Sequence, residues 1–179
     1  FKNSKINYSG GYGLRGSYNG RTILIEDSEV RGALGQAINF WSGYQNSSFT
    51  MKGCTIVSCE TSSNLINFNE SGSVLIENNK ITGNKNGTIR LSWIQGDDII
   101  IKNNDFSKNT DGYSIYSNGG YRENLSILIE GNKIDGGSSY HGEIGVSEFH
   151  QDAEVIVRNN TIEKRGNAIH VYGNNGGIT

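Results

Sequence analysis

A six-residue unit recurs along the chain, and it constrains the fold more than any other feature. Each copy opens with an apolar residue and has a second apolar residue five positions later, as in Ile76–Ile81 and Ile129–Ile134. Most copies have a further apolar residue two positions before the first, and this period-2 alternation is typical of a strand with one buried face. The copies begin 24 to 28 residues apart, at Phe1, Ile25, Met51, Ile76, Ile101, Ile129 and Val157.

A second strand is predicted in each repeat, after a polar stretch of variable length. Short strands without a helix cannot bury their apolar face alone, so the copies must stack on one another. We therefore expect an all-β fold, a single-stranded parallel solenoid of about seven coils with roughly 25–28 residues per coil, forming one domain over residues 1–179. The apolar pairs that define the second strand are Ile38/Phe40, Ile66/Phe68, Ile89/Leu91, Ile144/Val146 and Ile169/Val171.

Two rows of residues support this register. The residue after each opening apolar position should point outward and lie about 4.8 Å from its equivalent in the next coil. These residues alternate in charge at every step, which places opposite charges side by side. At one turn position asparagine recurs in four coils, where stacked amides can hydrogen-bond along the axis. The charged row is Lys2, Glu26, Lys52, Glu77, Lys102, Glu130 and Arg158, and the asparagine row is Asn79, Asn104, Asn132 and Asn160.

Composition narrows the range of partners. The formal net charge is -2, so nothing electrostatic favours a nucleic-acid partner. No apolar run approaches the roughly 18 residues of a membrane span, so we expect no membrane insertion. Cys54 and Cys59 are too close to close a long loop and too few for a disulfide framework or a zinc site, and we interpret them as small, partly buried side chains.

The sequence resembles right-handed parallel β-helix proteins, whose repeats are found in pectate lyases, their relatives and phage tailspikes. The apolar-x-Asn-Asn-x-apolar turn carries the resemblance, as in Ile76–Ile81 and Ile101–Phe106. It implies a right-handed β-helix that is extracellular, on a cell surface or on a virion. It also implies a polysaccharide or cell-surface glycan as partner, as for a tailspike, an adhesin or a carbohydrate-active module. An enzyme of this kind would be a polysaccharide lyase or a glycoside hydrolase.

The two ends of the chain suggest a larger assembly. The sequence starts inside a repeat and offers no amphipathic helix to cap the exposed strand edges of a solenoid. We expect a segment of a longer chain, or a subunit that stacks end to end or forms a homotrimer. A stiff shaft or spacer without catalytic activity is the alternative function.

The outward face of the second strand is the expected binding surface. Arginine, asparagine and exposed aromatic residues on one face suit sugars, because rings stack on apolar sugar faces while polar groups bind hydroxyls. The candidate substrate-binding residues are Arg15, Trp41, Arg90, Trp93, Tyr116, His170 and Tyr172.

A set of acidic residues follows the same strand in successive coils. Carboxylates from adjacent coils can hold Ca²⁺ or act as the acid/base pair of a glycosidase, although solvated loop acids are the alternative. Gly96–Asp98 and Asn109–Gly112 also look like elements of polygalacturonases, but their order is reversed here, and we interpret this match as chance. The catalytic candidates are Asp97, Asp98, Glu123, Glu148 and Asp152, and the Ca²⁺ candidates are Asp97, Asp98 and Glu123.

Overall fold

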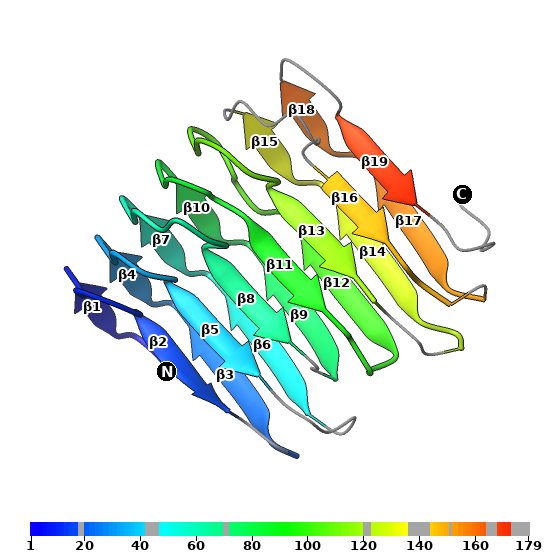
Figure 1. The fold of residues 1–179 in the computed structure, drawn as a ribbon, viewed down its shortest axis with the longest axis horizontal. Helices are drawn as coiled ribbons and strands as arrows, with labels where there is room; N and C mark the ends of the chain where they lie inside the picture. The colour runs from blue at the N-terminus through cyan, green and yellow to red at the C-terminus, as the bar shows by residue number, and fades with distance from the viewer. Residues whose placement is uncertain are drawn as a thin grey trace.

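The chain forms an elongated solenoid in which three columns of parallel strands stack along one axis (Figure 1). The computed structural model describes residues 1–17, 20–41, 47–69, 72–119, 123–135, 144–150, 152–163 and 168–172. In these ranges the regular structure is entirely strand, with no helix of the length and apolarity that a membrane span needs. The expected all-β parallel solenoid is confirmed.

Sheet A contains the strand that opens each repeat. Its five-residue strands alternate inward and outward side chains, and neighbouring strands pair in register, as Ile76 does with Ile101. The inward residues Ile76, Ile99, Ile101 and Ile127 are fully buried. The strands are β3 (Thr22–Glu26), β6 (Ser48–Lys52), β9 (Ser73–Glu77), β12 (Asp98–Lys102), β14 (Ser126–Glu130) and β17 (Glu154–Arg158).

Sheet B is a third column that was not predicted. The chain leaves sheet A through a left-handed residue, such as Asn78 (φ 56°) or Gly131 (φ 65°), and enters a strand of only three residues. The second apolar residue of each six-residue unit is the inward residue of this strand. The strands are β1 (Lys5–Asn7), β4 (Glu29–Arg31), β7 (Thr55–Val57), β10 (Lys80–Thr82), β15 (Lys133–Asp135) and β18 (Thr161–Glu163).

Sheet C contains the predicted second strand and has seven members. Its pairings confirm the proposed register, since Ile66 pairs with both Ile38 and Ile89. The strands are β2 (Leu14–Ser17), β5 (Ile38–Trp41), β8 (Ile66–Asn69), β11 (Ile89–Ser92), β13 (Ile115–Asn118), β16 (Ile144–Ser147) and β19 (Ile169–Tyr172).

The number of complete coils is smaller than the expected seven. Within the described residues, five coils have a strand in all three sheets: β3–β5, β6–β8, β9–β11, β14–β16 and β17–β19. In the first coil, a single residue, Lys2, pairs with sheet A, through an isolated bridge to Glu26. In the coil of β12 and β13, the single residue Asp105 takes the place of a sheet B strand and pairs with Lys80 and Lys133. The repeat therefore predicts the stacking, whereas the local backbone decides how many strands each coil forms.

The predicted asparagine row is a buried hydrogen-bonded ladder at the turn between sheets A and B. The Nδ2 group of Asn79 donates to Asn104 Oδ1, that of Asn104 to Asn132 Oδ1 and that of Asn132 to Asn160 Oδ1, each over 2.9 Å. Each Oδ1 also accepts a backbone N–H of the preceding coil; the N–H of Asn79, for example, donates to Asn104 Oδ1 over 3.0 Å. The amides thereby satisfy backbone groups that the turn would leave unpaired.

Each of the two cysteines occupies the position that an asparagine takes in the next coil: Cys54 corresponds to Asn79 and Cys59 to Asn84. The backbone N–H of Cys54 donates to Asn79 Oδ1, and that of Cys59 donates to Asn84 Oδ1. Both thiols are free and buried, and burial raises the pKa of each. We interpret both from the sequence as small, partly buried side chains, and the structure buries them more completely than that, with 3% of Cys54 and 0% of Cys59 exposed.

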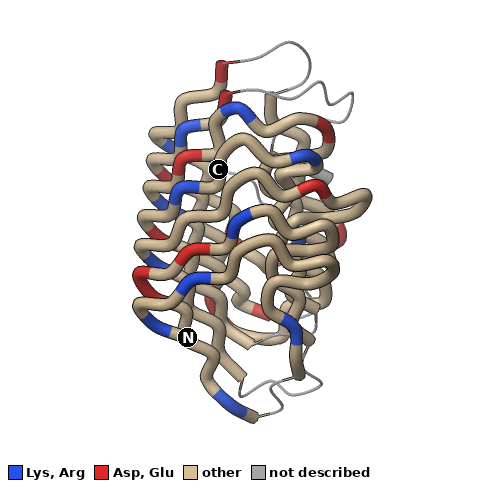
Figure 2. The backbone as a smooth tube through the Cα atoms, turned by 90° about the vertical axis from the view of Figure 1, so that its left-hand side faces the viewer, with Lys and Arg blue, Asp and Glu red and all other residues tan. Residues whose placement is uncertain are grey.

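The predicted charge row is also in register, and Figure 2 shows acidic and basic positions alternating along the solenoid. Glu26 accepts from Lys52 Nζ at 2.7 Å and from Lys2 Nζ at 3.0 Å, and Glu130 from Arg158 Nε at 2.8 Å. The hydrogen bond from Lys52, followed by that from Lys2, holds the pKa of the Glu26 carboxyl below its usual value. The cations of these pairs are exposed, whereas Glu26 is buried beneath Lys2 and Lys52. Because solvent screens the cations, the main effect of the pairs is on register rather than on stability.

One side chain breaks the apolar interior of sheet C. Ser117 occupies the inward row between Leu91 and Val146 and is fully buried, and its hydroxyl has no hydrogen-bond partner among the residues that the structure describes. We expect Ser117→Ala to raise the free energy of unfolding by about 1 kcal/mol, because it removes an unsatisfied buried hydroxyl.

Ser92→Ala is the matched control for that prediction. The buried Ser92 hydroxyl is fully engaged, because it donates to Asn118 Oδ1 over 2.9 Å and accepts from Arg90 Nε over 3.0 Å. Its removal should lower the free energy of unfolding by about 1 kcal/mol. Urea unfolding of both variants checks the sign, and a loss of stability in Ser117→Ala would contradict the prediction.

Candidate functional site

The outward face of sheet C carries the predicted binding row. Parallel pairing places Asn39 beside Asn67, Arg90 beside Tyr116, and His170 one coil beyond Gly145. Trp41 lies in the next outward row, two residues along its strand, where it pairs with Ser17 and Asn69. The sequence therefore predicts which residues share this face, because outward positions alternate along a strand.

A concavity on this face has Arg90 and Tyr116 in its lining. It has a volume of about 440 Å³ and is open to solvent. Its walls come from sheet C and from the loops that lead into sheet C in three successive coils. The lining residues are Ser62, Ser63, Asn64, Asn86, Thr88, Arg90, Gly112, Tyr113 and Tyr116.

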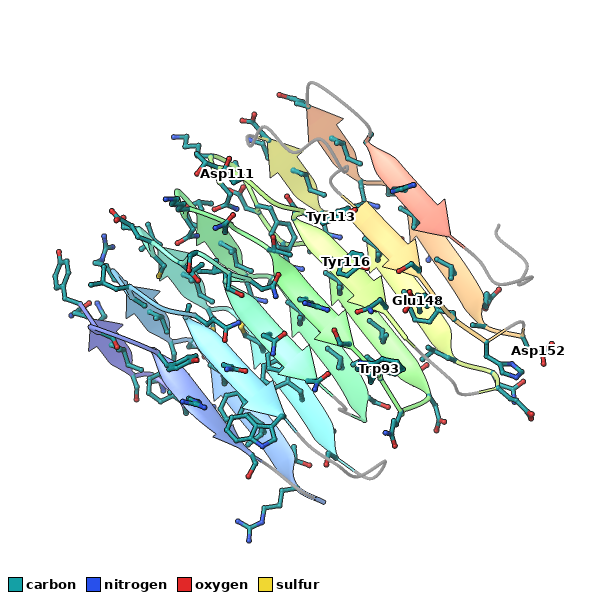
Figure 3. All side chains as sticks on the ribbon, viewed as in Figure 1. Trp93, Asp111, Tyr113, Tyr116, Glu148 and Asp152 are labelled. Carbon is teal, nitrogen blue, oxygen red and sulfur yellow. The ribbon has the colours of Figure 1, made fainter. Side chains whose placement is uncertain are left out.

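Two stacked tyrosines form one wall of this pocket. The rings of Tyr113 and Tyr116 lie 4.9 Å apart with an angle of 28° between their planes (Figure 3). They pack over Gly145, where a Cβ would approach both rings to 2.8 Å. Only glycine therefore leaves room for the tyrosine pair on this strand.

Arg90 is held in place by its neighbours on both sides. Its Nε donates to Ser92 Oγ over 3.0 Å, and its guanidinium lies 5.9 Å from the centre of the Tyr116 ring. The Tyr116 hydroxyl lies 3.4 Å from Ser147 Oγ, within hydrogen-bond distance. A cation fixed beside an aromatic wall suits a ligand with anionic or hydroxyl groups.

A second arginine–aromatic cluster lies on the same face toward the N-terminus. The Arg15 guanidinium lies 4.5 Å from the centre of the Tyr12 ring and 5.5 Å from that of Trp41, and both rings are 41% exposed. Between the two clusters, Asn67 Nδ2 donates to Asn39 Oδ1 over 3.2 Å. The face thus carries two cationic aromatic sites joined by amides.

A family comparison agrees with this geometry. The family model described as a right handed beta helix region matches residues 1–144. The chain belongs to this right-handed β-helix family. No curated protein and no solved structure matches the chain.

The acidic candidates of this β-helix lie at the other end of the sheet C strands from the tyrosine pocket. Asp97 lies between β11 and β12, and Asp98 is the first residue of β12. Glu123 precedes β14, and Glu148 and Asp152 precede β17. All five are exposed. Sheet C strands of four residues, about 13 Å long, separate them from the pocket.

The acidic candidates do not gather into a cluster of three or more within the described residues. Within the described ranges no group of three or more His, Cys, Asp and Glu side chains is close enough to hold a metal ion, and Asp97, Asp98 and Glu123 therefore do not form one. His150 Nδ1 lies 3.5 Å from Asp152 Oδ2, which pairs two side chains on one loop. The assignment of Asp97, Asp98 and Glu123 as Ca²⁺ ligands stays a prediction, since Ca²⁺ also binds backbone carbonyl oxygens and water.

The polygalacturonase-like segment has a structural explanation in the β-helix. Asn109 is buried, and its Oδ1 accepts the backbone N–H of Asn84 over 3.0 Å and the Asn84 Nδ2 group over 3.1 Å. Its Nδ2 donates to the Ile81 carbonyl over 2.7 Å. Asn84 and Asn109 thus form a second, shorter asparagine ladder. This structural role of Asn109 agrees with the interpretation of the polygalacturonase-like segment as a chance match.

The sequence did not predict the loop residues that line the pocket, nor the two aromatic residues Tyr12 and Tyr113. Some predicted residues also lie elsewhere than expected. Tyr12 and Tyr113 precede their strands, and only the loop conformation brings them onto the sheet C face. Trp93 follows β11 in a left-handed conformation (φ 58°), is 40% exposed, and lies against Gly119 away from the tyrosine pocket (Figure 3). His170 is partly exposed at the C-terminal end of the row, and the side chain of Tyr172 lies outside the described residues.

Proposed function

We propose that the chain binds a polysaccharide along the outward face of sheet C. The observation that carries the proposal is the pocket of about 440 Å³, in which a held guanidinium lies beside two stacked tyrosines and several hydroxyl and amide groups. Aromatic faces stack on the apolar faces of sugars, while arginine and amides bind hydroxyl or carboxylate groups.

The geometry favours a long ligand with acidic groups. Arg15 lies on β2 and Arg90 on β11, three strand steps apart in sheet C, which corresponds to about 14 Å. A chain that runs along the solenoid axis can contact both cations, and the Asn39–Asn67 pair lies between them. Acidic polysaccharides occur on cell surfaces. We therefore also propose that the chain is extracellular, on a cell surface or on a virion.

The pocket supports binding rather than acid/base chemistry. Among the described residues its lining contains no carboxylate, and the acidic candidates lie at the far end of the sheet C strands. A glycosidase needs two carboxyl groups on either side of the scissile bond. We therefore propose a carbohydrate-binding module, as in an adhesin or tailspike, and no cleavage step.

We expect Arg90→Gln to weaken binding of an acidic polysaccharide about tenfold or more, because it removes charge-assisted hydrogen bonds. A glycan array that includes acidic polysaccharides identifies the ligand, and calorimetric titration measures the dissociation constant. Lys133→Gln, which removes an exposed cation from β15 on sheet B, is the matched control and should leave binding unchanged. Absence of any glycan ligand, or equal affinity in Arg90→Gln and the unmodified chain, would contradict the proposal.

A structural shaft is the second candidate. The asparagine and charge ladders favour it, since they run through most coils and stabilise the stack without a ligand. A shaft predicts the same thermal midpoint with and without every polysaccharide, whereas a ligand that binds only the folded chain raises it.

A further inference from the structure

The outward face of sheet A carries a row in which five of the six side chains are aliphatic, contiguous from Leu75 to Ile156, and the sixth is Thr50. This row is the middle residue of each five-residue strand, and parallel pairing aligns its members, as Leu75 with Ile100 and Ile100 with Leu128. Leu24 is 42% exposed, and the others are partly exposed. The row consists of Leu24, Thr50, Leu75, Ile100, Leu128 and Ile156. A contiguous apolar row on an outer sheet face is typical of an interaction surface.

The two ends of each strand in this sheet are chemically matched. Three of the strands end in glutamate and begin with a hydroxyl residue, as in Ser126–Glu130. Two strands begin with an acidic residue, Asp98 or Glu154, and end with a basic residue, Lys102 or Arg158. The sixth strand begins with Ser48 and ends with Lys52. The six strands read TILIE, SFTMK, SVLIE, DIIIK, SILIE and EVIVR.

We propose that sheet A is the interface with a second copy of this chain, with a two-fold axis parallel to the solenoid axis. In that arrangement each strand faces its own equivalent running in the opposite direction. The aliphatic row then packs against itself at the usual spacing of about 10 Å between sheets. The first residue of each strand faces the fifth residue of the same strand in the other copy.

Charge complementarity supports this arrangement. Asp98 faces Lys102 of the second copy and Glu154 faces Arg158, so the two copies form four ion pairs. Glu77 and Glu130 face the hydroxyl groups of Ser73 and Ser126, which can donate to them. No position brings two like charges together, so the rim of the interface is satisfied along its whole length.

The size of the surface predicts a weak dimer. Six strands at about 4.8 Å spacing and five residues at about 3.3 Å give a footprint of roughly 29 Å by 16 Å. This lies below the area of a standard stable interface, so the dimer should depend on protein concentration. The inference concerns another face from the proposed glycan site and is independent of it.

Sedimentation equilibrium from roughly 1 µM to 1 mM tests the proposal. We expect a monomer–dimer equilibrium that Ile100→Lys abolishes and that Asp98→Lys weakens about tenfold, because the latter places like charges opposite each other at two positions. Val57→Lys, on an outward apolar residue of β7 in sheet B, is the matched control and should leave the dimer intact. Unchanged thermal melts at low concentration show that each variant folds.

Cysteine crosslinking tests the orientation. Leu24→Cys and Ile156→Cys lie at opposite ends of the row, and each should crosslink to itself in the dimer with a short bifunctional reagent. An antiparallel pair would bring at most one of the two close to its equivalent. A monomer at every concentration, a trimer, a dimer insensitive to Ile100→Lys, or crosslinking at only one of the two sites would overturn the proposal.

Discussion

Asn104→Ala is expected to lower the free energy of unfolding by about 4 kcal/mol. Asn104 Oδ1 accepts from both Asn79 N, over 3.0 Å, and Asn79 Nδ2, over 2.9 Å. Its own Nδ2 donates to Asn132 Oδ1 and to the Ile76 carbonyl, over 2.9 and 3.0 Å. Alanine leaves these buried groups without their partner, and each lost partner costs about 1 to 3 kcal/mol.

Asn103→Gly is the control for this ladder prediction. Asn103 is the next residue toward the N-terminus, is exposed, and has a left-handed backbone (φ 55°) that glycine adopts freely. The change should be within about 0.5 kcal/mol, as for most surface substitutions. Urea unfolding of both variants gives the comparison, and a loss below about 1 kcal/mol in Asn104→Ala would show that the ladder contributes little.

Gly96→Ala is expected to lower the free energy of unfolding by about 3 kcal/mol or more. Gly96 is buried where the chain leaves sheet C, and an added Cβ would overlap the backbone nitrogen of Ser73 and the carbonyl carbon of Gly72 in the preceding coil. Because these are backbone atoms fixed by stacking, the methyl group can be accommodated only by separating the two coils.

Gly10→Ala separates this close approach from the general effect of replacing glycine. An added Cβ at Gly10 meets no atom within 4 Å, so the change should be within about 0.5 kcal/mol. Thermal or urea unfolding provides the measurement. If the two substitutions have equal effects, steric contact between coils does not explain the need for glycine at Gly96.

The stacking register could be predicted because it depends on local periodicity. The alternating charges from Lys2 to Arg158 and the asparagines from Asn79 to Asn160 are meaningful only if equivalent residues lie side by side, and the structure pairs them so. The shorter ladder of Asn84 and Asn109 was missed because two members, 25 residues apart, do not stand out in an asparagine-rich chain.

Sheet B could have been found from the second apolar residue of each unit, such as Ile81 or Ile134. A strand of three residues carries a single inward side chain, so its period-2 alternation cannot be seen in the sequence. Its existence follows from the left-handed turn residue before it, which redirects the chain after sheet A.

The sequence by itself determined the solenoid, its register and the residues that share the outward face of sheet C, because strand alternation and repeat length depend on neighbours along the chain. Only the tertiary structure decided where a pocket forms, since Tyr113 reaches Tyr116 through a loop, over Gly145 of the next coil. It also decided that no three His, Cys, Asp or Glu side chains of the described residues lie close enough together to hold a metal ion. The repeat fixes the strands in space, whereas the position of a side chain on a connecting loop depends on how that loop packs against its neighbours.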